Sequence, residues 1–317
     1  MLLKPNTNII ITTWNALDYT KNTIESLFKN TNNAYYLTVV DNWSIDGTEE
    51  YLKALDPLPL NCVGYKYILN HENLGPGRAI NIWYKSFDTK YTCVANNDVW
   101  FGENWLCELE SALDSDPDLG IVSPLRPSAF IKHTYSNKST KDVVISTPIE
   151  FTIEEELAFF GHGKSMKEVI VDIIKANGGG IEYFNTPPGY VSTCTALVNN
   201  GIIDIIGWMA DPIFKTYGTE DIDLSWRIGF SRYKAAWVKS SYVHHFRHKS
   251  IQRNELDFKK CVKQNNAIFY EKWRHTIDDL LLQKDYQGNS IYDCMTKEDI
   301  EDFWFLRRLN ENIHFYS

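Results

Sequence analysis

The sequence has few of the features that mark membrane, secreted or disulfide-rich proteins. No stretch approaches the roughly 18 continuous apolar residues of a membrane span, and the start of the chain lacks the basic and apolar segments of a signal peptide. The six cysteines are scattered and include no CxxC pair. This pattern argues against a disulfide framework and predicts reduced thiols in a cytoplasmic protein.

Basic charge is also scarce. The chain has 32 Lys and Arg against 41 Asp and Glu, a formal net charge of −9. Because binding to nucleic acid depends largely on neutralising phosphates, this balance weighs against a nucleic-acid partner. One local basic segment, HHFRHKSIQR at 244–253, keeps that alternative open. The chain also contains neither GxGxxG nor GxxxxGK[ST], so it carries no dinucleotide fingerprint and no P-loop.

The remaining composition is that of an ordinary globular protein, with 44% apolar and 23% charged residues. A length of 317 residues suffices for one large domain or two modest ones. The aromatic share of 14% is high. Carbohydrate sites use aromatic faces, but a core rich in Tyr and Trp is the simpler explanation.

The first 125 residues alternate strand-like and helix-like patterns. Strands are predicted at 8–14, 35–44, 63–70, 91–96 and 119–126, and helices at 18–31, 46–55, 75–87 and 103–116. Such alternation predicts an α/β fold with a mostly parallel central sheet flanked by helices. Residues 126–190 are less regular and are predicted to form an insertion over one side of the crevice. From residue 254 onward the pattern becomes helical.

Polar residues follow four of the predicted strands, at 12–14, 41–44, 70–73 and 96–98. Ligands of open α/β sheets bind beyond the carboxyl ends of the strands. We therefore expect these four segments to converge on one crevice.

Two groups could form a metal site. A carboxylate such as Asp98 binds Mn²⁺ or Mg²⁺, whose other ligands are usually phosphate oxygens and water. His244 and His245 end a separate predicted strand, and an imidazole beside a carboxylate suits a mixed N/O site. The alternatives are an Asx turn at Asp98 and structural roles for the histidines.

Three acids, Glu220, Asp221 and Asp223, begin a predicted helix. Capping and the helix dipole explain one or two of them. A third that faces the crevice could act as a general base on a hydroxyl nucleophile. The segment NLGPGRAIN at 73–81 places a glycine-rich turn and Arg78 at another helix start, which suits a diphosphate.

Taken in order, these motifs resemble the glycosyltransferases of family two, nucleotide-sugar-dependent enzymes with the GT-A fold. The segments that carry the resemblance are IITTWNALDYT, VVDNWSIDGTEEYL, NHENLGPGRAIN, VANNDVWF, TCTALVNNGIIDIIGWMADPIF, YGTEDIDLSWRI and YVHHFRHKS. They extend over roughly residues 8 to 250. The resemblance implies a GT-A catalytic domain at 1–253 and a helical C-terminal extension at 254–317. Within the domain it implies a nucleotide-sugar half at 1–125 and an acceptor half at 126–253.

The resemblance also implies roles for individual residues. Those implied to bind the donor are Thr12, Trp14, Asp41, Ser44, Asn73, Gly75, Arg78, Asn96 and Asn97. Asp98 and His244 are implied to bind Mn²⁺ or Mg²⁺, with His245 as the competing ligand. Asp221 is implied to be the catalytic base with Glu220 beside it, and Trp208 and Asp211 to line the acceptor side. The chain departs from the family's D-x-D motif, because Asn-Asn-Asp at 96–98 supplies a single acid.

The implied reaction is transfer of a sugar, with inversion, from a UDP- or dTDP-sugar to a hydroxyl of a glycan or lipid-linked glycan. One alternative acceptor is a hydroxymethylated base of viral DNA. Another alternative is a catalytically inactive carbohydrate-binding module on the same fold. The C-terminal segment 298–316 could form a helix for dimerisation or for peripheral membrane contact, or could pack on its own domain.

Overall fold

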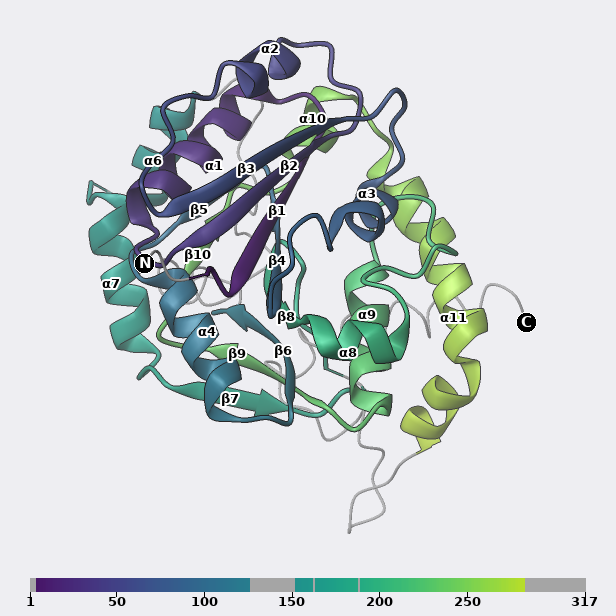
Figure 1. Cartoon of the computed structure of the whole chain (residues 1–317). Coiled ribbons are helices and arrows are strands. Elements are labelled where there is room, and N and C mark those ends of the chain that lie inside the picture. The colour runs from purple at the N-terminus through teal and green to yellow at the C-terminus, as the bar shows by residue number, and fades with distance from the viewer. Residues whose placement is uncertain (1–3, 126–151, 162, 188, 283–317) are drawn as a thin grey trace.

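A central eight-stranded sheet carries helices on both faces (Figure 1). The structure is a computed structural model and describes residues 4–125, 152–161, 163–187 and 189–282. The strands are β1 (Thr7–Thr13), β2 (Tyr35–Asp41), β3 (Cys62–Leu69), β4 (Tyr91–Asn96), β5 (Val99–Phe101), β6 (Leu119–Pro124), β7 (Ile181–Phe184), β8 (Thr195–Asn199), β9 (Lys234–Val238) and β10 (Val243–His245). The helices are α1 (Leu17–Asn30), α2 (Thr48–Lys53), α3 (Pro76–Trp83), α4 (Trp105–Ser115), α6 (Ile153–Gly161), α7 (Met166–Ala176), α8 (Asn200–Ile206), α9 (Glu220–Phe230), α10 (Lys249–Arg253) and α11 (Phe258–Leu282).

The strand order in the sheet is β3-β2-β1-β4-β8-β6-β9-β7. Strands β1 to β4 run parallel to one another, as do β6 and β9, whereas β8 and β7 run antiparallel to their neighbours. From β1 the chain proceeds outward to β2 and β3 and then returns to place β4 on the other side of β1. This reversal opens a crevice at the carboxyl ends of β1 and β4, the usual position for a ligand in such sheets.

The central strands are buried because helices cover both sheet faces. Ile9 and Ile11 of β1 pack with α1 and α4, whereas Ile10 between them packs with Ala79 of α3. Successive side chains of a strand point to opposite faces, so a strand buried on both sides reads as a continuous apolar run. Helices α8 and α9 cover the remaining part of the second face through Ile202 and other apolar residues.

A two-stranded antiparallel ribbon of β5 and β10 lies beside the large sheet. Helix α7 packs on this ribbon and on α1 through an apolar cluster that includes Ile170, Tyr19 and Phe246. The described helix α7 of the predicted insertion therefore packs against α1 and the ribbon, whereas its strand β7 joins the edge of the large sheet beside β9.

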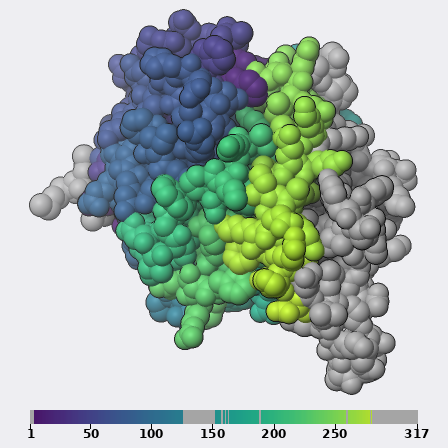
Figure 2. Space-filling view, turned by 90° about the vertical axis from the view of Figure 1, so that its right-hand side faces the viewer, coloured from purple at the N-terminus to yellow at the C-terminus, as the bar shows by residue number. Residues whose placement is uncertain are grey.

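Helix α11 packs on α9 through Phe269, which contacts Trp226 edge to face. In Figure 2 its yellow-green residues form a band beside the green residues of the α8–α9 region. The described part of the predicted helical extension thus packs on α9 of its own chain, and the segment 298–316 lies outside the described residues. Within the described ranges, no helix combines the length and the apolar character needed to cross a bilayer.

Candidate active site

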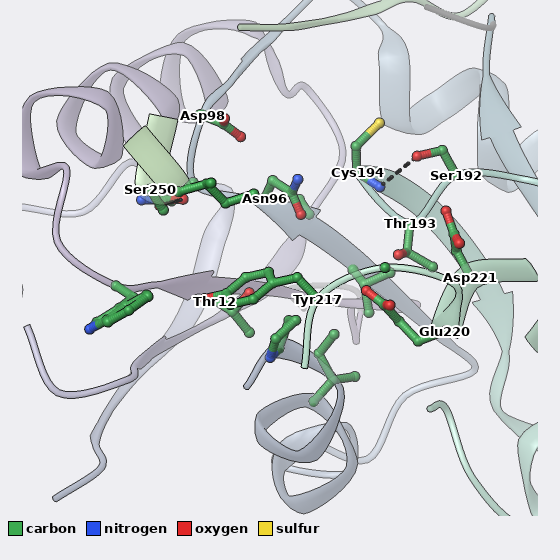
Figure 3. Close-up of a pocket in the computed structure, with 18 of the residues that line it drawn as sticks. Thr12, Asn96, Asp98, Ser192, Thr193, Cys194, Tyr217, Glu220, Asp221 and Ser250 are labelled. Carbon is green, nitrogen blue, oxygen red and sulfur yellow. Dashed lines mark hydrogen bonds between the residues drawn. The ribbon is translucent and has the colours of Figure 1, made fainter. Parts of the chain in front are cut away.

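A cleft lies where the polar strand ends meet. It is lined at the β1 end by Thr12 and Trp14 and at the β4 end by Asn96 and Asp98. Neighbouring segments contribute Ser192, Thr193, Cys194, Tyr217, Glu220, Asp221 and His245. Figure 3 shows Asn96 and Asp98 on one side of the cleft and Thr193, Glu220 and Asp221 on the other. The sequence prediction of a single crevice is thereby confirmed for the β1 and β4 ends.

Two aromatic rings stand at one end of the cleft. Trp14, just after β1, and Tyr217, just before α9, have ring centroids 6.4 Å apart and planes inclined by 20°. Nearby, Asp41 is almost fully buried and accepts hydrogen bonds from the Ser44 hydroxyl and from the Ser44 backbone N–H at 3.1 Å. Burial raises the pKa of Asp41 more than these hydrogen bonds lower it.

Asp98 and His245 form a close pair inside the cleft. His245 Nε2 lies 3.0 Å from Asp98 Oδ1, and the other carboxylate oxygen accepts from the Lys249 backbone N–H at 3.2 Å. Burial raises the pKa of Asp98, but the charge and hydrogen bond of His245 outweigh it and hold the pKa below its usual value. Burial lowers the pKa of His245, but Asp98 and Cys194 raise it to about 10.

In the ligand-free chain the 3.0 Å separation is that of a hydrogen bond, and with a pKa of about 10 His245 carries the shared proton. A divalent cation would have to displace that proton, and the same spacing would suit two of its ligands. Two ligand atoms about 2.1 Å from an octahedral ion and at right angles to each other lie about 3.0 Å apart. In the part of the chain that the structure describes, no cluster of three or more His, Cys, Asp or Glu could hold a metal ion. Asp98 and His245 alone would leave most positions around a cation to other ligands, namely phosphate oxygens and water.

Glu220 and Asp221 face this pair from the first turn of α9. Burial raises the pKa of both carboxyl groups, and the charge of Asp221 raises that of Glu220 further, to about 8. Burial raises the pKa of Asp221 to about 6, and the hydrogen bond that it accepts from the Ile222 N–H at 2.8 Å limits this rise. Glu220 Oε2 is buried without a hydrogen-bond partner among the described residues. Near neutral pH, Glu220 therefore keeps its proton while Asp221 is ionised, so the pair contains one acid and one base.

The family model described as Glycosyl transferase family 2 matches residues 8–174, just over half of the chain. The chain belongs to glycosyl transferase family 2. A search of curated proteins finds no match. The match to the family model confirms the family resemblance predicted from the motifs.

Solved structures show what this family-2 chain is similar to in fold. GalNAc-T7, solved with UDP, GalNAc and Mn²⁺, has a TM-score of 0.50 at 14% identity, covering 76% of this chain and 43% of that protein. Mannosyltransferase PcManGT from Pyrobaculum calidifontis, in complex with GDP-Man and Mn²⁺, gives 0.48 at 17% identity, covering 74% and 55%. TarS from S. aureus gives 0.45 at 12% identity, covering 74% and 35%. The chain thus covers little more than half of these proteins at most. The mostly parallel sheet flanked by helices and the likeness to GalNAc-T7 confirm the predicted GT-A type α/β fold.

The expected contact between Asp98 and His244 is wrong, because His245 occupies that place. His244 is buried and packs edge-on against Phe246 with ring centroids 4.9 Å apart. Its Nδ1 lies 3.5 Å from the Tyr242 hydroxyl. Neighbouring residues of a strand point to opposite faces, so only one of the two histidines of β10 can face the cleft.

Several residues predicted to bind the donor have their polar atoms engaged by the protein. The Asn97 amide donates to Thr13, Asn15 and Thr20, and its oxygen accepts from the Ser250 hydroxyl. Asn97 thereby fixes the loop that carries Asp98. Likewise, the Asn73 side chain accepts from the Gly75 N–H at 2.9 Å, at the start of α3. Gly75 has φ +76, a left-handed conformation that favours glycine.

Other predicted residues lie outside the cleft lining, including the donor candidates Asp41, Ser44, Asn73 and Gly75. Arg78 is exposed on α3, and the Trp208 side chain is 50% exposed on the loop after α8. Asp211 on the same loop forms an ion pair with Lys272 of α11 at 2.6 Å. The cleft lining adds Cys194 and Tyr217, which the sequence prediction did not include.

The basic segment 244–253 is largely internal. Lys249 is fully buried and forms an ion pair with Glu156, which also accepts from the Tyr19 hydroxyl at 2.8 Å. Arg253 pairs with Asp18 at 2.7 Å. This segment therefore offers few free charges to a nucleic-acid backbone.

Proposed function

We propose that this chain transfers a sugar from a nucleoside diphosphate sugar to an acceptor hydroxyl, with inversion at the anomeric carbon. One observation carries the proposal: the Asp98–His245 pair and the Glu220–Asp221 pair lie on opposite sides of one cleft at the β1 and β4 ends. The first pair suits the diphosphate and its cation, and the second suits a hydroxyl that must lose a proton.

The nucleotide would occupy the end of the cleft with Trp14 and Tyr217. Their inclined, nearly parallel rings offer an apolar surface to a base. Asp41 lies at the carboxyl end of β2, where its carboxylate could accept from the imide N–H of uracil or thymine. Thr12 and Asn96 offer neutral hydrogen-bonding groups to the ribose. A UDP- or dTDP-sugar is therefore the proposed donor.

Asp98 and His245 would hold Mn²⁺ or Mg²⁺ against the diphosphate. When bound, such a cation stabilises negative charge on the leaving diphosphate, typically by several kcal/mol. The Lys249 backbone N–H and the Asn97 network orient the Asp98 carboxylate for this task.

Asp221 would accept the proton of the acceptor hydroxyl as that oxygen attacks the anomeric carbon. Its carboxylate is ionised above a pKa of about 6, while Glu220 keeps its proton up to about 8. Glu220 could then donate a hydrogen bond to the acceptor without adding a second negative charge. Inversion requires one displacement and no covalent enzyme intermediate. The acceptor proposed is a glycan or a lipid-linked glycan.

The proposal is tested by a thermal-stabilisation screen of nucleotide sugars with and without Mn²⁺. The expected result is stabilisation by one donor class that increases with Mn²⁺. The Asp221→Asn variant should still bind that donor but lose transfer by about 10²–10⁴-fold. Asp88→Asn, at an exposed carboxylate, serves as the control and should retain full activity. Wild-type turnover in Asp221→Asn would remove Asp221 from the base role.

A further inference from the structure

The loop between α8 and α9, residues 207–219, forms one edge of the cleft and is here named the cleft loop. Its residues Met209, Ala210, Tyr217 and Gly218 line the cleft, and Glu220 and Asp221 follow directly. The position of this loop therefore decides where Tyr217 stands and how wide the cleft is.

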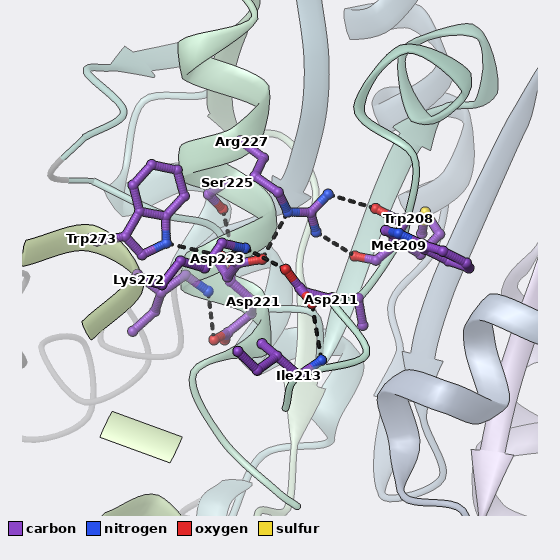
Figure 4. A network of polar contacts seen from close by, with 12 residues as sticks. Trp208, Met209, Asp211, Ile213, Asp221, Asp223, Ser225, Arg227, Lys272 and Trp273 are labelled. Carbon is purple, nitrogen blue, oxygen red and sulfur yellow. Dashed lines mark hydrogen bonds and ion pairs between the residues drawn. The ribbon is translucent and has the colours of Figure 1, made fainter. Parts of the chain in front are cut away.

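Buried Asp223 organises one end of the cleft loop. This carboxylate is fully buried on α9 and accepts from Arg227 Nε at 2.7 Å, Lys272 Nζ at 2.5 Å and Trp273 Nε1 at 2.9 Å. Arg227 in turn donates to the Trp208 carbonyl at 2.7 Å. Figure 4 shows Asp223 among these three donors. A buried carboxylate with three donors from two helices fixes α9 and α11 relative to each other.

Lys272 of α11 connects this centre to the cleft loop directly. Its ammonium group lies between two carboxylates, Asp223 and Asp211, the latter at 2.6 Å. Asp211 uses its other oxygen to accept from the Ile213 N–H at 2.9 Å. The same side chain thus stabilises the turn at 211–213 and links it to Lys272 of α11. The main chain of α11 departs from helical geometry at Trp273, the residue after Lys272, whose indole donates to Asp223.

A second residue of α11 holds the other end of the cleft loop. Asn265 is buried, and its amide donates to the carbonyls of Gly218 at 2.6 Å and Thr216 at 3.1 Å. Its oxygen lies 3.1 Å from the Thr216 hydroxyl. These contacts bracket Tyr217, the ring that faces Trp14. Neither Asn265 nor Lys272 lines the cleft, so both act through the loop.

We infer that α11 positions the cleft loop at two separate points, with Asn265 fixing the nucleotide end through Tyr217 and Lys272 fixing the acceptor end through Asp211. The assignment of the two ends rests on the proposed function, whereas the two anchors rest on the contacts alone. Asn265 and Lys272 are thus positioning residues for the transfer, supplied by a helix beyond the residues that the family model matches.

Hydrogen exchange of the full chain tests the two anchors without any substrate. In Lys272→Met and Asp211→Asn, amides at 213–214 should exchange at least tenfold faster, and amides at 217–218 should keep their wild-type rates. Lys263→Met, an exposed lysine on the same helix, is the matched control and should change neither segment. If Lys272→Met does not fold, Asp211→Asn decides, since it leaves the Lys272–Asp223 pair in place.

Asn265→Ala should give the converse pattern. Exchange should accelerate at 217–218 rather than at 213–214, and the thermal shift caused by UDP with Mn²⁺ should fall by at least half. In Lys272→Met that shift should remain. Acceleration spread evenly over the chain, no acceleration at all, or the same segment responding in both variants would each overturn the inference.

Kinetics with the donor and acceptor found by screening separate positioning from simple stability. Lys272→Met should raise the acceptor KM about tenfold and leave the donor KM within twofold. An equal change in both constants would contradict the assignment of ends. If the wild type transfers no sugar, the proposed function fails while the exchange pattern still decides the two anchors.

Discussion

Replacing Glu220 by glutamine should remove a loss of stability that the wild type suffers as pH rises. Glu220 has a pKa of about 8 in the folded chain against 4.5 for the ordinary side chain, because burial and the charge of Asp221 disfavour ionisation. Between these two pH values the folded state binds more protons than the unfolded state. The free energy of unfolding must therefore fall as pH rises through this interval.

The magnitude follows from the shift. Each pH unit between the two pKa values costs about 1.4 kcal/mol, so about 2–3 kcal/mol should be lost between pH 6 and pH 8.5. Glutamine has similar size and no charge, so this part of the pH dependence should disappear in Glu220→Gln. With a urea m-value of about 3 kcal/mol/M for a chain of this size, the midpoint advantage of the variant over the wild type should grow by about 0.7–1 M between pH 6 and pH 8.5.

The assay is urea unfolding of the ligand-free chain at pH 6 and pH 8.5. Glu25→Gln is the matched control, because Glu25 is exposed on α1 and should show no such gain. Equal midpoints for wild type and Glu220→Gln at pH 8.5, or a gain that is larger at pH 6, would refute the assignment of a buried, proton-retaining carboxyl group to the cleft.

Three further outcomes follow from the site. Asp221 is increasingly protonated below its pKa of about 6, so the kcat/KM for transfer should rise tenfold per pH unit as the pH increases towards 6. A flat profile from pH 4.5 to 6 would contradict the base assignment. His245→Ala should abolish the part of UDP stabilisation that requires Mn²⁺, whereas His275→Ala, at an exposed histidine of α11, should retain it; the same Mn²⁺ effect in both variants would exclude His245 as a ligand. Glu156→Gln should lower the free energy of unfolding by about 3–5 kcal/mol, measured in urea, because the fully buried Lys249 loses that carboxylate; a loss below about 1 kcal/mol would show that the pair contributes little.

The strand positions were accessible from the sequence because they depend on local pattern. The β-branched run at 8–14 predicted β1, which the structure places at Thr7–Thr13, and the run at 91–96 predicted β4 at its observed bounds. The polar residues after these strands predicted the cleft. Parallel strands bring their carboxyl ends to one edge of a sheet, so chain order alone places such residues together.

The choice between the two histidines was not accessible in this way. Both follow the same apolar run, and β10 is only three residues long, so the pattern does not show which of them faces inward. Its pairing with β5, with His244 opposite Trp100 and His245 opposite Val99, fixes the faces. A shift of the register by one residue would exchange the two histidines.

The sequence by itself determined the family, the α/β class, the order of the strands along the chain and the meeting of the β1 and β4 ends at the cleft. These properties depend on short motifs and on hydrophobic periodicity, which each segment carries independently. Only the tertiary structure decided that His245 meets Asp98, that a carboxyl oxygen of Glu220 is buried beside Asp221, and that Lys272 and Asn265 of α11 hold the cleft loop. Each of these pairings joins residues through packing, burial and register, which depend on the whole folded chain and not on any one segment.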